Sequence, residues 1–235
     1  MKLCMFHPVD HPMERGWVGR IDGDRMIHLA AQTLQSFFTG GGSSREHAVY
    51  PLERVKLLAP VLHPPAVRVF VDETSFAFAN PAAIRGPDSE IDCGHVPGDD
   101  LSQSALALCP RVAAVVGAGG VIGGFTAFAE WLNPALSPPK DRDFALGLGP
   151  VVVTPDALDT RALEVVVRVD GEERLRATPA AFDWESARDL AARGTALHPG
   201  DVLAGPPAGS VGGLDRRHTV ELDVTGIGVL RQVVA

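Results

Sequence analysis

The segment KDRDFALGLGPVVVT, residues 140–154, places a charged stretch, a turn rich in glycine and proline, and an apolar strand directly after one another. Its last part, Val151–Val153, is a continuous apolar run, as expected for a strand covered on both faces. Turn residues are frequent throughout, since the 235 residues include 25 glycines and 19 prolines. This share is well above the usual one. It indicates many short elements and excludes an all-helical bundle.

The chain beyond residue 60 is rich in predicted strands. Apolar runs or apolar-polar alternation predict strands at 67–71, 111–116, 151–153, 163–169, 220–224 and 229–233. One helix is well signalled, with Asp183 as its N-cap and Gly194 where a C-terminal glycine cap belongs. The expected fold class is α+β, dominated by β-structure.

Residues 1–60 are predicted to be a small N-terminal β/α domain. A hairpin is expected at 17–29, with its turn at Asp22-Gly23-Asp24, and a helix-like apolar pattern follows at 30–38. A strand at 55–58 leads into a proline-rich joint. We place the boundary there, so that residues 61–235 form the large domain.

Composition narrows the class of protein. The formal net charge is −8, from 21 Lys and Arg against 29 Asp and Glu, and nucleic-acid binding is not expected because phosphates need a basic face. The most apolar stretch, 112–125, contains five glycines and is shorter than the about 20 residues of a spanning helix, so no membrane partner is expected. Cys4, Cys93 and Cys109 lack CxxC spacing, which favours a reducing cytoplasm over a disulfide framework or structural zinc site.

A glycine-rich run, VVGAGGVIG at 115–123, has some features of a dinucleotide-binding loop. However, Ile122 stands where the third glycine of GxGxxG belongs, and no strand ending in an acid follows. We interpret this run as a glycine-rich turn next to a strand.

Glu130, Lys140 and Asp143 form the candidate functional cluster. Glu130 follows the apolar segment 124–129, and a carboxylate in such a position is costly to bury unless it is paired or bound to a metal. Lys140 and Asp143 precede the turn that leads into a buried strand. The alternative is that all three are ordinary surface charges near loops.

Several motifs together resemble the fumarylacetoacetate hydrolase (FAH) family. They are KDRDFALGLGPVVVT at 140–154, VRVDGE at 167–172, LHPGDVLAGPPAG at 197–209, and VEL through GIGVL at 220–230. The N-terminal hairpin and KLLAPV at 56–61 also resemble the entry into the family's main domain. The match runs in order over nearly the whole chain. It implies layered, strongly bent mixed β-sheets with few helices, and a homodimer.

The resemblance also implies metal-dependent chemistry. In the family, Mg or Mn sits on a Glu-x-Glu pair and a downstream Asp, and it polarises a 2-oxo or β-diketo acid for C–C hydrolysis, decarboxylation or tautomerisation. Here the pair falls on Cys109 and Arg111, and the downstream acid on Glu130. Lys140 matches the family's active-site lysine, and Asp143 the acid that follows it.

These departures predict that the metal site is lost. Without two of its three carboxylates the site has too few oxygens for Mg or Mn, and Arg111 adds a fixed positive charge where the cation would sit. We predict that Arg111 replaces the metal and pairs with Glu130, with Asp143 as a further partner to consider, and that no metal cofactor is bound. One alternative stays open, in which Asp72 or Glu73 rebuilds a metal site.

Two functions from different classes fit these residues. The first is an enzyme acting on a small oxo acid, in which Arg111, Glu130 and Lys140 are catalytic and Glu130 moves a proton. The residues expected to bind the substrate are Arg111, Lys140, Asp143, Gly205 and Pro206. Proton transfer or decarboxylation is favoured over hydrolysis, because no group that activates water is evident. The second is a catalytically inactive binding module or partner subunit.

Overall fold

The structure, a computed structural model, describes residues 1–92 and 105–235. Strands dominate it and form two sheets, of 13 and 5 strands. The larger sheet contains β1 (Lys2–Pro8), β2 (Trp17–Asp22), β3 (Arg25–Ala30), β4 (Ser43–Pro51), β5 (Val55–Leu58), β6 (Val67–Asp72), β7 (Ser75–Ala79), β8 (Ile84–Arg85), β10 (Leu106–Val116), β11 (Ile122–Leu132), β12 (Leu146–Val153), β15 (Val202–Ala204) and β16 (Val211–Leu214). The expected β-dominated α+β class with mixed sheets is therefore confirmed.

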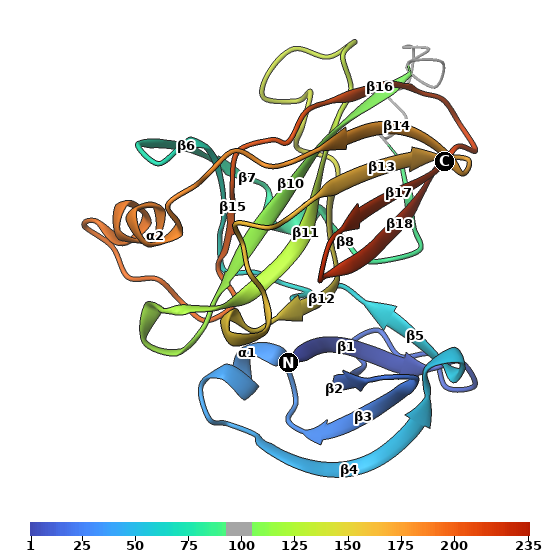
Figure 1. Cartoon of the computed structure of the whole chain (residues 1–235), viewed down its shortest axis with the longest axis vertical. Helices are drawn as coiled ribbons and strands as arrows, with labels where there is room; N and C mark the ends of the chain where they lie inside the picture. The colour runs from blue at the N-terminus through green and yellow to red at the C-terminus, as the bar shows by residue number, and fades with distance from the viewer. Residues whose placement is uncertain (93–104) are drawn as a thin grey trace.

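The larger sheet runs through the whole molecule. Its order is β4-β3-β2-β1-β12-β11-β10-β15-β6-β7, with β5 on β1, β8 on β12 and β16 on β10. The N-terminal strands form the lower part of the view in Figure 1 and join the rest through β1 and β12, where Leu3 is opposite Val152. Strands from before residue 60 therefore pair with strands from after it in one sheet. The division into domains 1–60 and 61–235 stays a prediction.

The smaller sheet has the order β14-β13-β17-β18-β9. Its strands are β9 (Ser89–Ile91), β13 (Val165–Val169), β14 (Glu172–Ala177), β17 (Thr219–Val224) and β18 (Gly228–Val234). One buried hydrogen bond joins the two sheets, because Trp131 Nε1 on β11 donates to Gln232 Oε1 on β18 at 2.8 Å. Gly147 on β12 makes room for this pair, since a Cβ there would collide with the Gln232 amide. The sheets thus pack face to face over a core that includes Trp131.

Two α-helices lie among the described residues, α1 (Leu34–Phe38) and α2 (Trp184–Ala192). Short 3₁₀ turns occupy Leu52–Arg54, Pro81–Ala83, Ala118–Gly120 and Pro155–Ala157. The predicted N-cap of α2 is confirmed, because the Asp183 carboxylate accepts hydrogen bonds from the backbone N–H groups of the first turn. The helix expected over 30–38 is wrong in its first part. Thr33 caps α1 instead, and Ala30 still belongs to β3.

The glycine-rich run at 115–123 is a turn, as interpreted from the sequence. It ends β10, passes through a 3₁₀ turn and begins β11. Gly119 and Gly120 have φ values of 64° and 77° there, a region that glycine adopts without the steric cost of a Cβ. No helix in the described ranges has the length and apolar character to cross a bilayer.

Candidate functional site

The hairpin of β10 and β11 brings three of the singled-out side chains to one face of the sheet. Cys109 is directly opposite Glu130, and Arg111 is opposite Phe128. Because side chains alternate along a strand, Cys109 and Arg111 point to the same side of β10, and Glu130 and Phe128 share that side on β11. Cys109 and Arg111, two positions apart on β10, thus share the face of the sheet that carries the Glu130 carboxylate of β11.

Arg111 and Glu130 form a buried ion pair. The Arg111 Nε donates to Glu130 Oε2 at 2.9 Å, and Nη2 lies 2.7 Å from the same oxygen. Only 7% of the Arg111 side chain and 3% of the Glu130 side chain is exposed. The predicted pairing of Arg111 with Glu130 is therefore confirmed.

Arg111 also joins two further segments to the β10–β11 hairpin through hydrogen bonds. Its Nη1 donates to the Phe70 carbonyl on β6 at 2.9 Å and to the Gly205 carbonyl, just after β15, at 2.7 Å. All three guanidinium nitrogens therefore contact groups of the protein itself. Arg111 is buried at the point where β6, β10, β11 and the turn after β15 meet.

A second guanidinium, which the sequence analysis did not select, lies beside Glu130. Arg142 Nη1 is 3.6 Å from Glu130 Oε1, and its Nε and Nη2 donate to Asp141 Oδ2 at 3.1 and 2.8 Å. The hydrogen bond to Asp141 raises the pKa of Arg142 most, and the charge of Glu130 adds to this. The alternating charges of residues 140–143 were the available signal. They do not reveal which cation of the loop contacts Glu130.

Lys140 and Asp143 pair with each other. Lys140 Nζ lies 2.7 Å from Asp143 Oδ2, and 70% of the Lys140 side chain is exposed. Asp143 is thus a partner of Lys140, so the option that it pairs with Arg111 is wrong. The loop between β11 and β12 turns this ion pair outward while Asp141 is buried.

Cys109 is half-buried, and its burial disfavours the thiolate. Burial raises the pKa of the thiol most and the Glu130 charge also raises it, which outweighs the lowering by a hydrogen bond with Ser210 and by the charges of Arg111 and Arg142. A raised thiol pKa means little thiolate at neutral pH, hence a poor nucleophile and a poor metal ligand. Cys4 is also a free thiol, whereas Cys93 lies outside the described residues.

Asp72 and Glu73 lie at the turn between β6 and β7. The Asp72 carboxylate accepts from Thr74 N at 2.8 Å and from the Thr74 hydroxyl at 2.6 Å, and these bonds lower its pKa. Glu73 accepts from the backbone N–H of Asp183 at 3.2 Å. Asp72 therefore serves a local turn, and Glu73 contacts the residue that caps α2. Across residues 1–92 and 105–235, no three His, Cys, Asp or Glu side chains are grouped so that they could hold a metal ion.

Gly205 and Pro206 line a small cavity of about 30 Å³ with Val112, Phe182 and Trp184. A Cβ at Gly205 would lie 2.9 Å from Trp184 Cη2, so only glycine allows this approach of the indole. The structure thus joins Gly205 to Arg111 through its carbonyl and to Trp184 through its α-carbon.

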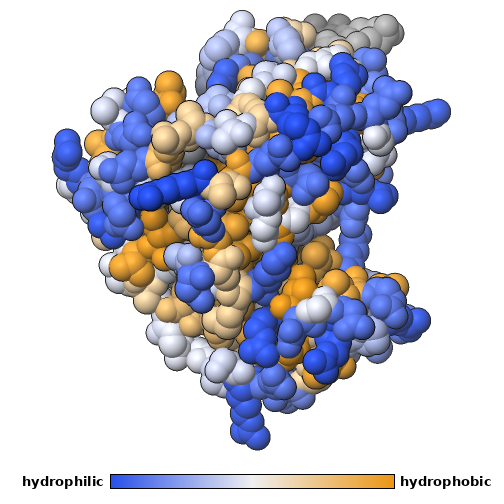
Figure 2. All heavy atoms as spheres, in the orientation of Figure 1, coloured by the Kyte–Doolittle hydropathy of each residue, from blue (hydrophilic) through white to orange (hydrophobic). Residues whose placement is uncertain are grey.

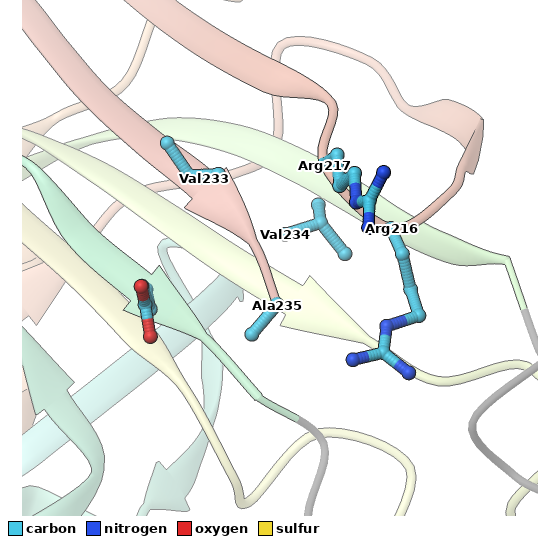
Figure 3. Close-up of a pocket in the computed structure, with 6 residues that line it drawn as sticks. Arg216, Arg217, Val233, Val234 and Ala235 are labelled. Atoms are coloured by element: carbon cyan, nitrogen blue, oxygen red, sulfur yellow. The ribbon is translucent and has the colours of Figure 1, made fainter.

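Apolar side chains gather below α2 and around the β10–β11 turn (Figure 2). A cleft of about 470 Å³ lies there, with Phe125 and Leu158 on its walls, and it shares Thr160 and Trp184 with the small cavity at Gly205. A different cavity, of about 670 Å³, is lined by Arg216, Arg217 and the C-terminal residues (Figure 3). None of the residues that line it contacts Arg111 or Glu130 within the described chain.

Comparison with known families gives a match over most of the chain. A family profile described as "Fumarylacetoacetate (FAA) hydrolase C-terminal" matches residues 52–235. No curated protein matches the chain.

Solved structures with the same fold span the whole chain. A maleylpyruvate hydrolase from Sphingobium sp. SYK-6, in complex with manganese (II) ion and pyruvate, has 19% identity and a TM-score of 0.77 over 100% of this chain and 99% of its own. A fumarylacetoacetate hydrolase from Exiguobacterium antarcticum has 22% identity and a TM-score of 0.78, covering 100% and 99%. A 2-hydroxyhepta-2,4-diene-1,7-dioate isomerase from Mycobacterium marinum has 21% identity and a TM-score of 0.76, covering 100% and 98%. At these identities the comparison establishes a shared fold.

Proposed function

Because the chain belongs to the fumarylacetoacetate hydrolase family, we propose that it is a small-molecule enzyme that acts on an oxo acid without a divalent cation. The buried Arg111–Glu130 pair carries this proposal. Two family relatives in fold, the isomerase and the pyruvate-bound hydrolase, are described with such acids or their enols. The proposal keeps this substrate class, but a guanidinium takes the place of the divalent cation as the source of positive charge.

The donor set does not suit a hard cation. Mg and Mn prefer several oxygen ligands, whereas this site offers a thiol with a raised pKa, a guanidinium and one carboxylate. That carboxylate is already bound through Oε2 to Arg111. The residues therefore do not fit the family's metal, and no step of the proposed reaction passes through one.

The reaction that these groups support best is keto–enol tautomerisation. Glu130 Oε1, the oxygen not bound by Arg111, would take a proton from the carbon beside the keto group. It would return that proton to the oxygen or to the conjugated carbon. Arg142 Nη1, which lies 3.6 Å from Oε1 in the free protein, would move to the substrate oxygen and stabilise the negative charge that develops there. Lys140 would hold the substrate's carboxylate after leaving Asp143, its partner at 2.7 Å, and the turn at Gly205 and Pro206 would hold the substrate's body. Proton transfer of this kind needs no activated water.

A second candidate is a catalytically inactive binding protein, and one observation favours it. Arg111 has all three nitrogens in contact with protein groups, and Glu130 is almost fully buried. A substrate would have to move Arg142 to reach Glu130 Oε1, since Arg142 Nη1 lies 3.6 Å away. If Arg142 does not move, the pair is structural only.

Turnover assays with and without EDTA test the proposal. We expect purified protein to tautomerise or decarboxylate oxaloacetate or an acylpyruvate at a rate that EDTA does not change. Glu130→Gln should lower kcat by roughly 10²-fold or more, the usual contribution of a general base, while Glu172→Gln, at an exposed position of β14, should match the wild type. EDTA-sensitive turnover would contradict metal independence. Absence of turnover on every substrate would favour the inactive candidate.

A further inference from the structure

A cavity of about 190 Å³ lies where the N-terminal strands meet the proline-rich joint before β6. Its walls come from β1, the loop before β2, the first turn of α1 and the joint. The lining residues are Met5, Arg15, Thr33, Gln35, Pro60, Leu62 and His63. None of them belongs to the site around Arg111 and Glu130.

The backbone that carries Arg15 is fixed by its neighbour. Gly16 has φ +66°, and a Cβ there would collide with the Phe6 carbonyl and lie 2.8 Å from Leu58 Cδ1. Only glycine lets the loop lie this close to β1 and β5. The backbone of Arg15 therefore has a defined position beside the cavity, although the Arg15 side chain is exposed.

The opposite wall is equally constrained. Gln35 Nε2 donates to the His63 carbonyl at 3.5 Å, and Gly200 leaves the space that the Gln35 side chain fills, since a Cβ there would lie 2.5 Å from it. Pro64 and Pro65 follow His63 and restrict the joint. Two preformed walls mean that a ligand would not have to order them on binding.

The charges that face the cavity are all positive or neutral. Its lining contains a guanidinium and an imidazole and no carboxylate. Within residues 1–92 and 105–235, neither the Arg15 nor the His63 side chain has a hydrogen-bond or ion-pair partner. Glu14 precedes Arg15 but does not line the cavity. In a chain with net charge −8, this is a local concentration of free donors.

The floor of the cavity is apolar. Met5 is 1% exposed and Pro60 is also buried, and Leu62 lies beside them. An apolar floor with a few convergent polar groups is the usual composition of a small-molecule site. The volume is below the roughly 300 Å³ of sites for drug-sized ligands, which limits the occupant to a short molecule.

We propose that this cavity is a second ligand site, for a small organic anion. Its carboxylate would contact Arg15 and His63, and its short apolar body would lie on Met5 and Leu62. Charge-assisted hydrogen bonds from a guanidinium to a carboxylate are the strong ones in proteins. Because such a ligand would contact the N-terminal loop and the joint together, binding should also raise the melting temperature of the whole chain.

Isothermal titration of the full-length protein with hexanoate, at constant ionic strength, tests this site. We expect saturable binding of one hexanoate per chain, and weaker binding of inorganic phosphate, which lacks an apolar body. Arg15→Gln should weaken hexanoate binding about tenfold, the loss expected for one charge-assisted contact, and His63→Gln several-fold. Arg25→Gln, at an exposed position of β3, is the matched control and should bind as the wild type does.

Two further variants separate this site from the proposed catalytic one. Lys140→Gln and Glu130→Gln should leave hexanoate affinity unchanged, whether or not the protein turns over any oxo acid. The proposal is overturned if Arg15→Gln binds like the wild type, if Lys140→Gln rather than Arg15→Gln abolishes binding, or if millimolar hexanoate gives no saturable signal. Failure of the turnover assay alone does not bear on this site.

Discussion

Arg111 holds one oxygen of Glu130 with two nitrogens, since Nε lies 2.9 Å and Nη2 2.7 Å from Oε2. The other oxygen, Oε1, lies 3.6 Å from Arg142 Nη1. One buried carboxylate therefore lies between two guanidiniums. A divalent cation approaching it would meet two positive charges, and within residues 1–92 and 105–235 no three His, Cys, Asp or Glu side chains are grouped to hold it.

Arg111→Ala should lower the free energy of unfolding by about 3 kcal/mol. The substitution leaves Glu130 buried without its main partner, and breaking a buried pair by removing one member typically costs about 3–5 kcal/mol. Urea unfolding followed by circular dichroism measures the change. A double variant, Arg111→Met with Glu130→Leu, should recover much of the loss because no buried charge remains. A change below about 0.5 kcal/mol for Arg111→Ala, as surface substitutions give, would show that the pair is not buried.

Arg68 on β6 and Asp201, just before the parallel strand β15, form a second buried pair. Arg68 Nη1 lies 3.1 Å from Asp201 Oδ2, with 6% and 1% of the side chains exposed, and Asp201 also accepts from His198 N. Asp201→Asn should destabilise the protein by about 3 kcal/mol, because it leaves the Arg68 charge buried.

The matched control for that pair is Asp223→Asn. It removes the partner of Arg168 at 3.2 Å, but both side chains are about one-third exposed, so the expected cost is below about 1 kcal/mol. Equal losses in chemical unfolding for the two variants would contradict the burial argument.

His28 should make the fold less stable as the pH falls from about 7.5 to about 5.5. Its ring stacks on Trp17 at 4.7 Å and contacts His47 at 5.1 Å. Burial first, and the neighbouring His47 second, lower the pKa of His28 below 6.5. Below pH 6.5 the unfolded chain therefore binds a proton that the folded chain does not yet bind, and stability falls with decreasing pH.

The measurement is the urea midpoint at both pH values. His28→Gln cannot titrate, so it should lose less stability between them than the wild type does. His11→Gln, at an exposed position outside this cluster, should keep the wild-type pH dependence. A His28→Gln variant with an unchanged pH dependence would be inconsistent with the lowered pKa.

Much of the fold could be predicted from local patterns. Alternation identified β6, β17 and β18, and Asp183 with its capping geometry identified the start of α2. β4 escaped prediction because most of its residues are exposed and show no apolar face. The helix expected from Ala30 onward begins later than predicted, because the Thr33 side chain caps its first turn. The expected homodimer and cytoplasmic localisation stay predictions.

The candidate site was only partly predictable. The family resemblance placed Arg111 and Glu130 at neighbouring metal-ligand positions, and the pairing of β10 with β11 in the structure brings them to one face. The loop at 140–143 has no such rule. The family resemblance selected Lys140 and Asp143 there, whereas the structure turns Lys140 outward and buries Asp141. The role of Arg142 therefore needed coordinates.

A titration of Mn²⁺ followed by electron paramagnetic resonance tests the central claim, that the Arg111 guanidinium takes the place of a cation, most directly. The wild type should leave Mn²⁺ free at millimolar concentration. Cys109→Glu combined with Arg111→Glu, which places carboxylates beside Glu130, should bind about one Mn²⁺ per chain, because oxygen ligands then surround the site. Binding of one Mn²⁺ by the wild type that Glu130→Gln abolishes would contradict the account.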